Sequence, residues 1–299
     1  MVKTATKKAK IAAKKTAAQT RKTTTVSEKH ATAKVARRPA SKITFEHLRR
    51  WNGWLAVVHA LQGIAVLIFS TSHSLPLTSQ YLSKDTLAST AAGHPVLAVA
   101  TRHLLDVRLA YLVAAFFFMC AIAHAVVATI YRERYETDLD KGINRARWIE
   151  YAVSASTMMV AIGFLTGIYD LSTLLLVFVL TSIMSLLGLA MEVFNQGKRT
   201  PSWLAYGIGC IAGIAPWIAV AIYVYGAIVY GSGNIPTFVY WIYGTMFILF
   251  SSFAVNMYLQ YKQKGKWADY LYGERMYMIL SLVAKSLLAW QIFAGALRP

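Results

Sequence analysis

The amino-acid sequence predicts an all-α membrane protein, a bundle of seven transmembrane helices. Three observations predict this fold class: an apolar composition, seven long apolar runs, and basic residues concentrated on one side of those runs. Of the 299 residues, 57% are hydrophobic and only 15% are charged, whereas a soluble domain carries about 25% charged residues. The composition therefore excludes an ordinary soluble domain. The 13% of aromatic residues also excludes a chain that is disordered throughout.

Each apolar run is long enough to cross a bilayer, because a hydrocarbon core of about 30 Å needs about 20 residues of helix. A helix also satisfies its own backbone hydrogen bonds in lipid. The runs comprise residues 51–71, 104–131, 151–169, 171–191, 203–230, 235–261 and 276–297. A polar turn is predicted at residues 142–150, before the third run. The two halves show no internal repeat, which disfavours an inverted-repeat transporter.

The two cysteines, Cys120 and Cys210, both lie inside apolar runs. Two cysteines are too few for a disulfide scaffold. We therefore predict that both are small buried apolar side chains.

The N-terminal segment differs in composition from the rest of the chain. Residues 1–50 contain fifteen Lys and Arg and only two acidic residues, Glu28 and Glu46. The segment is rich in Lys, Ala and Thr, so it cannot bury enough apolar area to offset its ordering entropy. We predict a basic disordered cytoplasmic tail over residues 1–45 and a transmembrane domain over residues 46–299. Three roles stay open for the tail: fixing membrane topology, binding anionic lipid or nucleic acid, or acting as an organelle transit peptide.

The basic residues between the runs predict the orientation in the membrane. With the N-terminus in the cytoplasm, the short cytoplasmic segments carry eleven Lys and Arg, and the outer segments carry four, Lys84, Arg102, Arg108 and Arg298. Basic residues concentrate on the cytoplasmic side of membrane proteins. We therefore expect a multi-pass protein of the cell membrane with a cytoplasmic N-terminus and an extracellular C-terminus.

A charged side chain inside a membrane helix indicates function, because it is costly to bury. Lys285 lies near the middle of the last run, and Glu150 lies just inside the third. At 1.5 Å per residue, Glu150, His59 and His124 are each expected roughly 12 Å from the cytoplasmic end of their helices. Helical side chains point towards the N-terminus. The Lys285 ammonium is therefore expected to reach this layer, with Ser281 one turn earlier on the same face.

A buried lysine of this kind has a particular chemical use. A desolvated lysine can condense with an aldehyde to a Schiff base, which needs a carboxylate counterion when protonated. Glu150 is the embedded candidate, because Asp170 and Glu192 fall at the ends of the fourth run and are expected to be interfacial. A structural ion pair between Lys285 and Glu150 is the alternative. Each histidine has an alternative as well, a hydrogen-bonded packing role.

The sequence around these positions resembles a known family. The last run reads SLVAKSLLAWQIF at residues 281–293, and the third helix contains RWIEY at residues 147–151. The loop before the last run contains KGKW at residues 264–267, and the fifth run contains IAGIAPW at residues 211–217. Over about residues 51–299 the chain resembles the heliorhodopsins, which are retinal-binding proteins of inverted topology. The long basic tail departs from the family pattern, so the resemblance implies nothing about it.

The resemblance implies a retinal site. Lys285 would carry all-trans retinal, Glu150 would be the counterion, and His59 and His124 would form a polar cluster on the cytoplasmic side. Ser281 would occupy the position where pumping microbial rhodopsins usually carry an aspartate. An outer β-ribbon would occupy residues 72–102.

Four further residues complete the predicted site. Arg147 and Ser154 on the third helix are grouped with the polar cluster. From their helix positions, Trp217 and Phe250 are candidate contacts of the retinal ring, and apolar packing accounts for each equally well.

The leading functional hypothesis is a light-sensing photoreceptor that is not an enzyme. The resemblance implies a homodimer with a slow photocycle and no ion pumping, and a sensor needs a signalling partner, which the sequence does not identify. The first alternative is a light-driven or light-gated proton transporter with a path through His59 and His124, although a pump usually needs carboxylates on both sides of the Schiff base. The second is a retinal-free seven-helix transporter that binds its substrate with Lys285 and Glu150.

Overall fold

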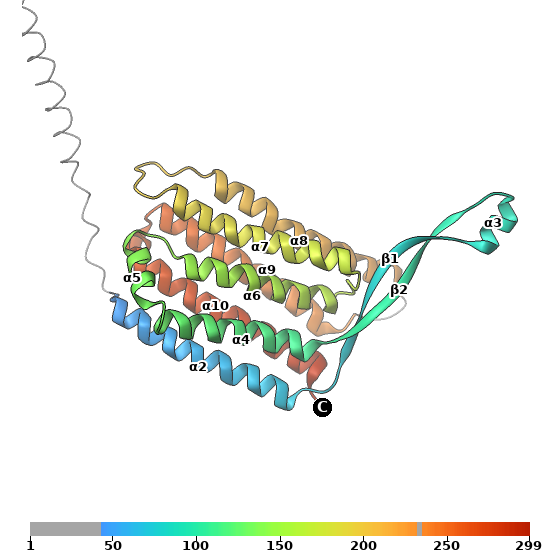
Figure 1. The fold of residues 1–299 in the computed structure, drawn as a ribbon, viewed down its shortest axis with the longest axis horizontal. Helices are drawn as coiled ribbons and strands as arrows, with labels where there is room; N and C mark the ends of the chain where they lie inside the picture. The colour runs from blue at the N-terminus through green and yellow to red at the C-terminus, as the bar shows by residue number, and fades with distance from the viewer. Residues whose placement is uncertain (1–42, 232–234) are drawn as a thin grey trace, which may run out of the picture. The chain divides into compact units, whose positions relative to one another are not determined.

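A computed structural model describes residues 43–231 and 235–299. In this part of the chain, seven long helices lie side by side (Figure 1). They are α2 (Phe45–Phe69), α4 (Leu109–Ala128), α6 (Arg145–Leu165), α7 (Leu171–Phe194), α8 (Leu204–Tyr230), α9 (Thr237–Tyr261) and α10 (Tyr270–Ile292). Consecutive helices pack against each other from α2 to α8, and α10 packs against both α9 and α2. All seven are long and apolar enough to span a membrane, which confirms the predicted fold class.

Three helices begin earlier than their apolar runs. Helix α2 begins at Phe45 after the capping residue Thr44, whose hydroxyl accepts from the backbone N–H of His47 at 3.1 Å. Helix α6 begins at Arg145, inside the predicted polar turn, and α10 begins at Tyr270. The starts of these helices are fixed by the capping side chains of Thr44, Asn144 and Asp269 rather than by hydropathy. The predicted tail over residues 1–45 lies, except for its last three residues, outside the described ranges.

One short helix, α5 (Arg132–Asp140), was not predicted from the apolar runs. It connects α4 to α6 and lies at one end of the bundle (Figure 1). Its residues Tyr135 and Leu139 are buried and belong to an apolar cluster that includes Ile43 and Leu48. Burial raises the pKa of the Tyr135 hydroxyl, so this tyrosine stays neutral in its apolar surroundings. We call this end of the molecule the α5 end.

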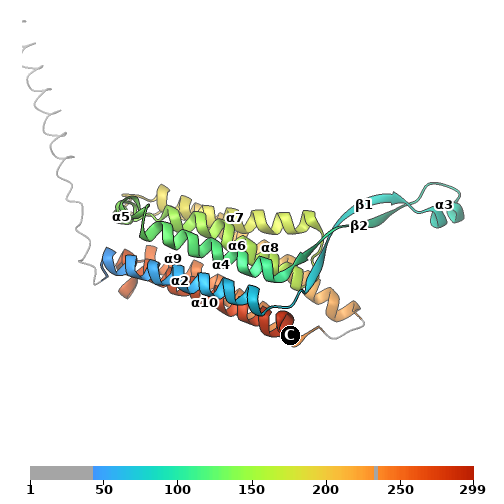
Figure 2. The same ribbon diagram turned by 60° about the horizontal axis from the view of Figure 1, so that its bottom comes forward.

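The predicted β-ribbon is present at the opposite end, and it is longer than expected. Strands β1 (Ser74–Lys84) and β2 (Leu97–Arg108) pair antiparallel, with the short helix α3 (Thr86–Ala92) between them. Strand β2 includes residues 104–108, which the second apolar run had placed in a helix. Figure 2 shows the ribbon extending away from the helix ends. The N–H of Thr78 donates to the carbonyl of Tyr169 at 2.8 Å, which ties the base of the ribbon to the loop before α7.

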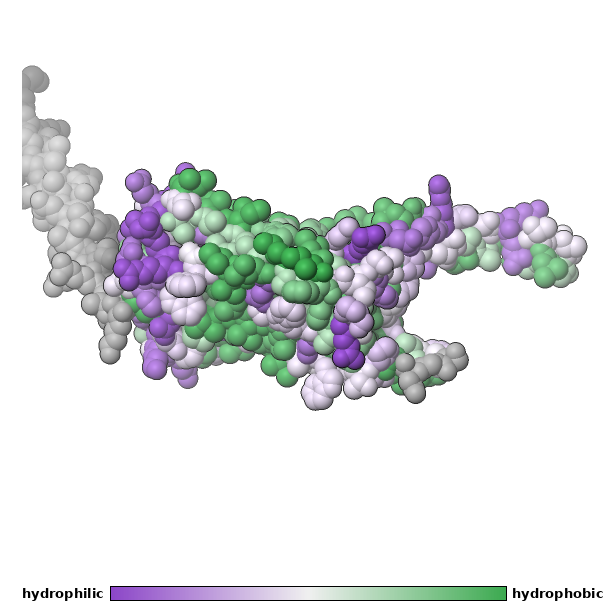
Figure 3. Space-filling model, turned by 90° about the horizontal axis from the view of Figure 1, so that it is seen from below, coloured by the Kyte–Doolittle hydropathy of each residue, from purple (hydrophilic) through white to green (hydrophobic). Residues whose placement is uncertain are grey.

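The surface of the bundle is apolar over its middle and polar towards the α5 end, as the face in Figure 3 shows. Large apolar side chains of the spanning helices, such as Leu175, Trp241 and Ile248, are exposed. A contiguous apolar surface of this extent needs a non-aqueous partner, and a bilayer supplies it. The core lies between α4, α6 and α10, where Phe117 and Ile162 are fully buried.

Two short helical turns flank α10. The first, η1 (Gly265–Ala268), contains the KGKW tryptophan, and the indole N–H of Trp267 donates to Asn256 Oδ1 on α9 at 2.7 Å. The second, η2 (Phe293–Leu297), continues α10 as a π-helical turn.

Candidate functional site

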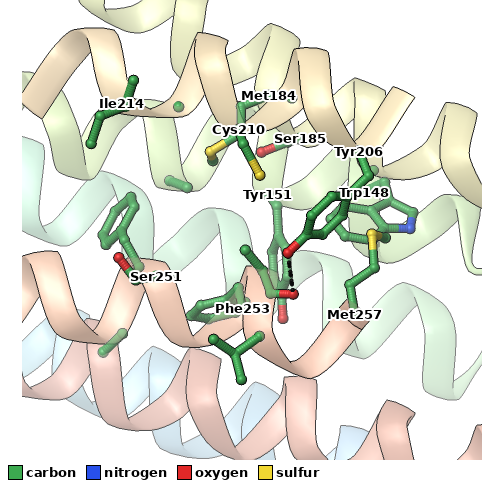
Figure 4. A pocket seen from close by; sticks show the side chains of 18 of the residues that line it. Trp148, Tyr151, Met184, Ser185, Tyr206, Cys210, Ile214, Ser251, Phe253 and Met257 are labelled. Carbon is green, nitrogen blue, oxygen red and sulfur yellow. Dashed lines mark hydrogen bonds between the residues drawn. The ribbon is translucent and has the colours of Figure 1, made fainter. Parts of the chain in front are cut away.

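A cavity of about 640 Å³ lies among helices α6 to α10, and Figure 4 shows the side chains that converge on it. Its walls are mostly apolar and aromatic, and Lys285 and Ser281 on α10 are among its polar lining residues. Small residues on α7 and α8 leave room for larger neighbours. A Cβ atom at Gly188 would lie 2.4 Å from the Trp148 ring, and one at Gly213 would lie 2.5 Å from Met184 Sδ.

Lys285 is held by two polar partners. Its Nζ donates to Ser281 Oγ at 2.7 Å and to Glu150 Oε1 at 3.1 Å. The lysine is only 3% exposed, and its Nζ lies 5.0 Å from the centre of the Tyr151 ring. A buried charge needs a partner of opposite sign and hydrogen bonds, and Glu150 and Ser281 supply both. The structure therefore brings these three predicted residues together, as the helical spacing predicted for Ser281.

A thiol and two imidazoles lie beside the pair of Lys285 and Glu150. The Cys120 thiol on α4 donates to Glu150 Oε1 at 2.7 Å. His124 lies one turn further along α4, and its ring stacks on that of His59 with a centroid distance of 5.7 Å. His59 and His124 therefore lie in one layer, as predicted. Cys120 is buried as predicted, and it is also a hydrogen-bond donor.

The amide of Asn52 fixes the tautomer of His124. Asn52 Nδ2 donates to the carbonyl of Leu48 at 2.9 Å, so its Oδ1 faces His124 Nδ1 at 2.7 Å. Because an amide oxygen only accepts, Nδ1 is the protonated nitrogen of His124. Nε2 of His124 has no hydrogen-bond partner among the described residues, and neither ring nitrogen of His59 has one.

Arg147 binds carboxylates that the sequence did not pair with it. Its guanidinium forms salt bridges with Glu192 on α7 and Glu274 on α10. It also lies 3.9 Å from the centre of the Tyr277 ring and 4.6 Å from that of Trp148. Glu192, expected at the end of its helix, lies two residues before the end of α7, and it is only 2% exposed.

The carboxylates of this second cluster have further donors. Glu192 accepts from the backbone N–H of Asn144 and from the Trp148 indole, both at 2.8 Å, and Glu274 accepts from the Asn144 amide at 2.6 Å. We call Arg147, Glu192 and Glu274 the arginine cluster. A small cavity of about 40 Å³ is lined both by Arg147 and Glu274 and by His124 and Glu150. Arg147 thus reaches the predicted polar cluster through this cavity.

The remaining predicted residues lie near the same site. Trp217 and Phe250 both line the large cavity, with ring centres 5.5 Å apart and planes 78° apart. Ser154 is fully buried on α6, one turn after Glu150. The prediction of burial is wrong for Cys210, which is exposed. The same residue lines the large cavity.

The heliorhodopsin family model matches residues 48–297. This chain belongs to the heliorhodopsin family. It is therefore a retinal-binding rhodopsin and a multi-pass membrane protein. No curated protein matches the chain significantly.

Two solved structures share the fold of this heliorhodopsin. The light-driven proton pump LR (Mac) from Leptosphaeria maculans has a TM-score of 0.57 and 14% identity, and the match covers 82% of this chain and 92% of that one. The cyanorhodopsin from the cyanobacterium Tolypothrix sp. NIES-4075 has a TM-score of 0.52 and 12% identity, covering 86% of this chain and 96% of that one. At such low identity, the likeness concerns the fold alone.

Retinal fits the large cavity on three counts. The cavity has walls that suit a polyene, a volume of about 640 Å³, and the amine of Lys285 in its wall. Ligand cavities of about 300–1,000 Å³ bury a small molecule almost completely. Trp217, Phe250 and Lys285 line this cavity. Glu150 lies next to it through its bond to Lys285.

Proposed function

We propose that this heliorhodopsin is a light-sensing photoreceptor in which Lys285 carries all-trans retinal as a protonated Schiff base and Glu150 is the counterion. The observation that carries the proposal is the buried pair of Lys285 and Glu150 at the wall of an apolar cavity. When bound, retinal supplies the absorption of visible light and the change of shape that follows it.

The residues of this chain have distinct roles in the proposal. The Lys285 ammonium would hold retinal through loss of one water, which would leave one proton and one positive charge on the nitrogen. The Glu150 carboxylate holds that proton at the nitrogen through its negative charge, and the Ser281 hydroxyl orients the lysine side chain. Trp217 and Phe250 confine the ring, because large aromatic side chains form rigid walls.

The stacked pair His59 and His124 supplies candidate proton acceptors. His59 and His124 lie near both Glu150 and Lys285, and three of their four ring nitrogens have no partner among the described residues. Imidazoles are the side chains best suited to hold a proton near neutral pH. We propose that this polar cluster, with Arg147 and Ser154 beside it, takes up charge displaced after illumination.

A sensor fits better than a pump because of the distribution of carboxylates. None of the residues that line the large cavity in the described ranges is Asp or Glu. The nearest carboxylate, Glu150, lies on the side of the histidines. A pump needs a second acceptor or donor across the Schiff base, so we propose a slow photocycle without ion pumping. The stacked histidines favour one second candidate, a light-gated or light-driven proton transporter, which photocurrents under voltage clamp would reveal.

The remaining proposals concern assembly and placement. We propose a homodimer, which rests on the family resemblance alone. We also propose placement in the cell membrane with a cytoplasmic N-terminus, supported by the eleven basic residues of the short segments on that side against four on the other. The signal would pass to a partner of unknown identity. The basic tail would contact anionic lipid, with nucleic acid as the alternative.

Absorption spectra test the chromophore proposal. Purified protein mixed with all-trans retinal should gain a visible band, and acid should shift that band to the red as the counterion protonates. The Lys285→Ala protein should gain no band, and Glu150→Gln should lack the acid-induced shift. Visible absorption that persists in Lys285→Ala would refute the attachment site.

A further inference from the structure

Two donors share one oxygen of the proposed counterion. Glu150 Oε1 accepts from Lys285 Nζ at 3.1 Å and from the Cys120 thiol at 2.7 Å. Cys120 is fully buried, with 0% exposure. A buried thiol beside a carboxylate keeps its proton, because a thiolate there would be both desolvated and repelled. The S–H group is therefore available as a donor.

The thiol becomes more important when Lys285 is modified, and this step depends on the proposed function. As an ammonium, Nζ has three protons and donates to both Ser281 and Glu150. A protonated Schiff base keeps only one N–H and can serve one acceptor. Because the thiol proton does not change, Cys120 remains a donor to Glu150 Oε1 in either state.

Cys120 adjoins both members of the proposed chromophore pair, Glu150 and Lys285. It is absent from the residues that line the large cavity, whereas the other cysteine, Cys210, lines that cavity. Cys120 also lies one helical turn before His124, on the same face of α4. It therefore acts on this pair from α4, outside the large cavity.

We propose that Cys120 is a positioning residue that donates its S–H to Glu150 and so sets how readily the counterion takes up a proton. A thiol is a weaker donor than a hydroxyl, and alanine donates nothing. Hydrogen bonds to the charged form of a carboxylate favour that form. The strength of the donor at position 120 therefore predicts the midpoint pH of the acid-induced colour change. This midpoint is highest for Cys120→Ala, and it is lower again for Cys120→Ser.

The first test uses the retinal-free protein and does not depend on the chromophore. The S–H stretch lies in an infrared region with few other protein bands, and the chain has two cysteines in all. In a Cys210→Ala background, the one remaining band belongs to Cys120, and Cys120→Ser removes it. We expect this band at the low frequency of a strongly bonded thiol, with a shift to higher frequency in Glu150→Gln. A band at the frequency of a free thiol would overturn the proposal, even if Glu150→Gln fails to fold.

The second test uses the retinal-bound protein. We expect the midpoint of the acid-induced colour change to rise by about one pH unit in Cys120→Ala, the size expected for the loss of one hydrogen bond to a charged acceptor. Cys120→Ser should restore it to the wild-type value or below. Equal midpoints in Cys120→Ala and Cys120→Ser would overturn the proposal.

The two tests separate this inference from the proposed function. A bonded S–H band in a protein that gains no visible absorption with retinal would refute the photoreceptor and keep the thiol bond. A visible band with an acid-induced shift that is indifferent to Cys120 would refute the role of the thiol and keep the photoreceptor.

Discussion

Replacement of Arg147 by methionine would leave two carboxylates buried without their cation. Glu192 is 2% exposed and Glu274 is 1% exposed, and both pair with this guanidinium. Removal of one partner from a buried ion pair costs about 3–5 kcal/mol, because the remaining charge is desolvated and uncompensated. At about 2–4 °C per kcal/mol for a domain of this size, Arg147→Met should lower Tm by roughly 6–20 °C.

The control is an ion pair that is exposed on both sides. Arg50 on α2 pairs with Glu46, and their side chains are 76% and 47% exposed. Exposed ion pairs contribute about 0–1 kcal/mol. Arg50→Met should therefore change Tm by a few degrees at most. The measurement is thermal unfolding of the three proteins in detergent, followed by circular dichroism.

Neutralising the carboxylates should reverse most of the loss. In Arg147→Met with both Glu192→Gln and Glu274→Gln, no buried charge remains in the arginine cluster. A buried ion cluster replaced by neutral side chains of similar size is often as stable as the original. We expect the triple variant to be more stable than Arg147→Met alone. If Arg147→Met costs no more than Arg50→Met, or the triple variant is the least stable, the electrostatic reasoning fails.

Three further predictions use single sites. The hydroxyl of Ser172 and the N–H and hydroxyl of Thr173 hold the pKa of Asp170 below its usual range, so its contribution to stability is present above the unfolded value of about 3.9 and is lost as pH falls through the folded value. Acid should therefore destabilise the wild type more than Asp170→Asn, and in neutral solution Asp170→Ala should cost about 1 kcal/mol as a lost helix cap. Gly188→Ala should cost about 1–3 kcal/mol by overpacking, whereas Gly207→Ala, with open space at its Cβ position, should be neutral or slightly stabilising in the same melts. Saturating retinal should raise Tm of the wild type by linkage and leave Lys285→Ala unchanged, and an equal rise in both would contradict covalent attachment.

Hydropathy predicted the helices because a segment inside the hydrocarbon core of a bilayer must be apolar. Every spanning segment must be apolar for about 20 residues, so the seven runs were visible without any knowledge of contacts. The ends were less visible. Thr44 and Asn144 start α2 and α6 through side-chain caps. A hydropathy profile does not distinguish a capping residue from any other short polar residue.

The lysine site was predictable because its members are exceptional in their surroundings. Lys285 is a lone charge in an apolar run, and Ser281 follows from helical spacing alone. The partners of Arg147 were not predictable in this way. Glu192 and Glu274 lie 45 and 127 residues further along the chain, near helix ends where acidic residues are common. Cys120 gave no polar signal at all, because a thiol in an apolar run is usually only a small apolar side chain.

The arginine cluster and the pair of Lys285 and Glu150 differ in formal charge. The arginine cluster pairs one cation with two carboxylates, so its formal charge is negative and it depends on the donors from Asn144 and Trp148. The pair of Lys285 and Glu150 is formally neutral. In the proposed function, condensation with an aldehyde replaces an ammonium by a protonated imine, so the nitrogen keeps one positive charge. The negative charge of Glu150 therefore faces one positive charge on the Lys285 nitrogen before and after retinal attaches. The fold already buries this carboxylate in the protein without retinal. Only movement of the proton itself can unbalance this pair, and that movement is the event that a light sensor must report.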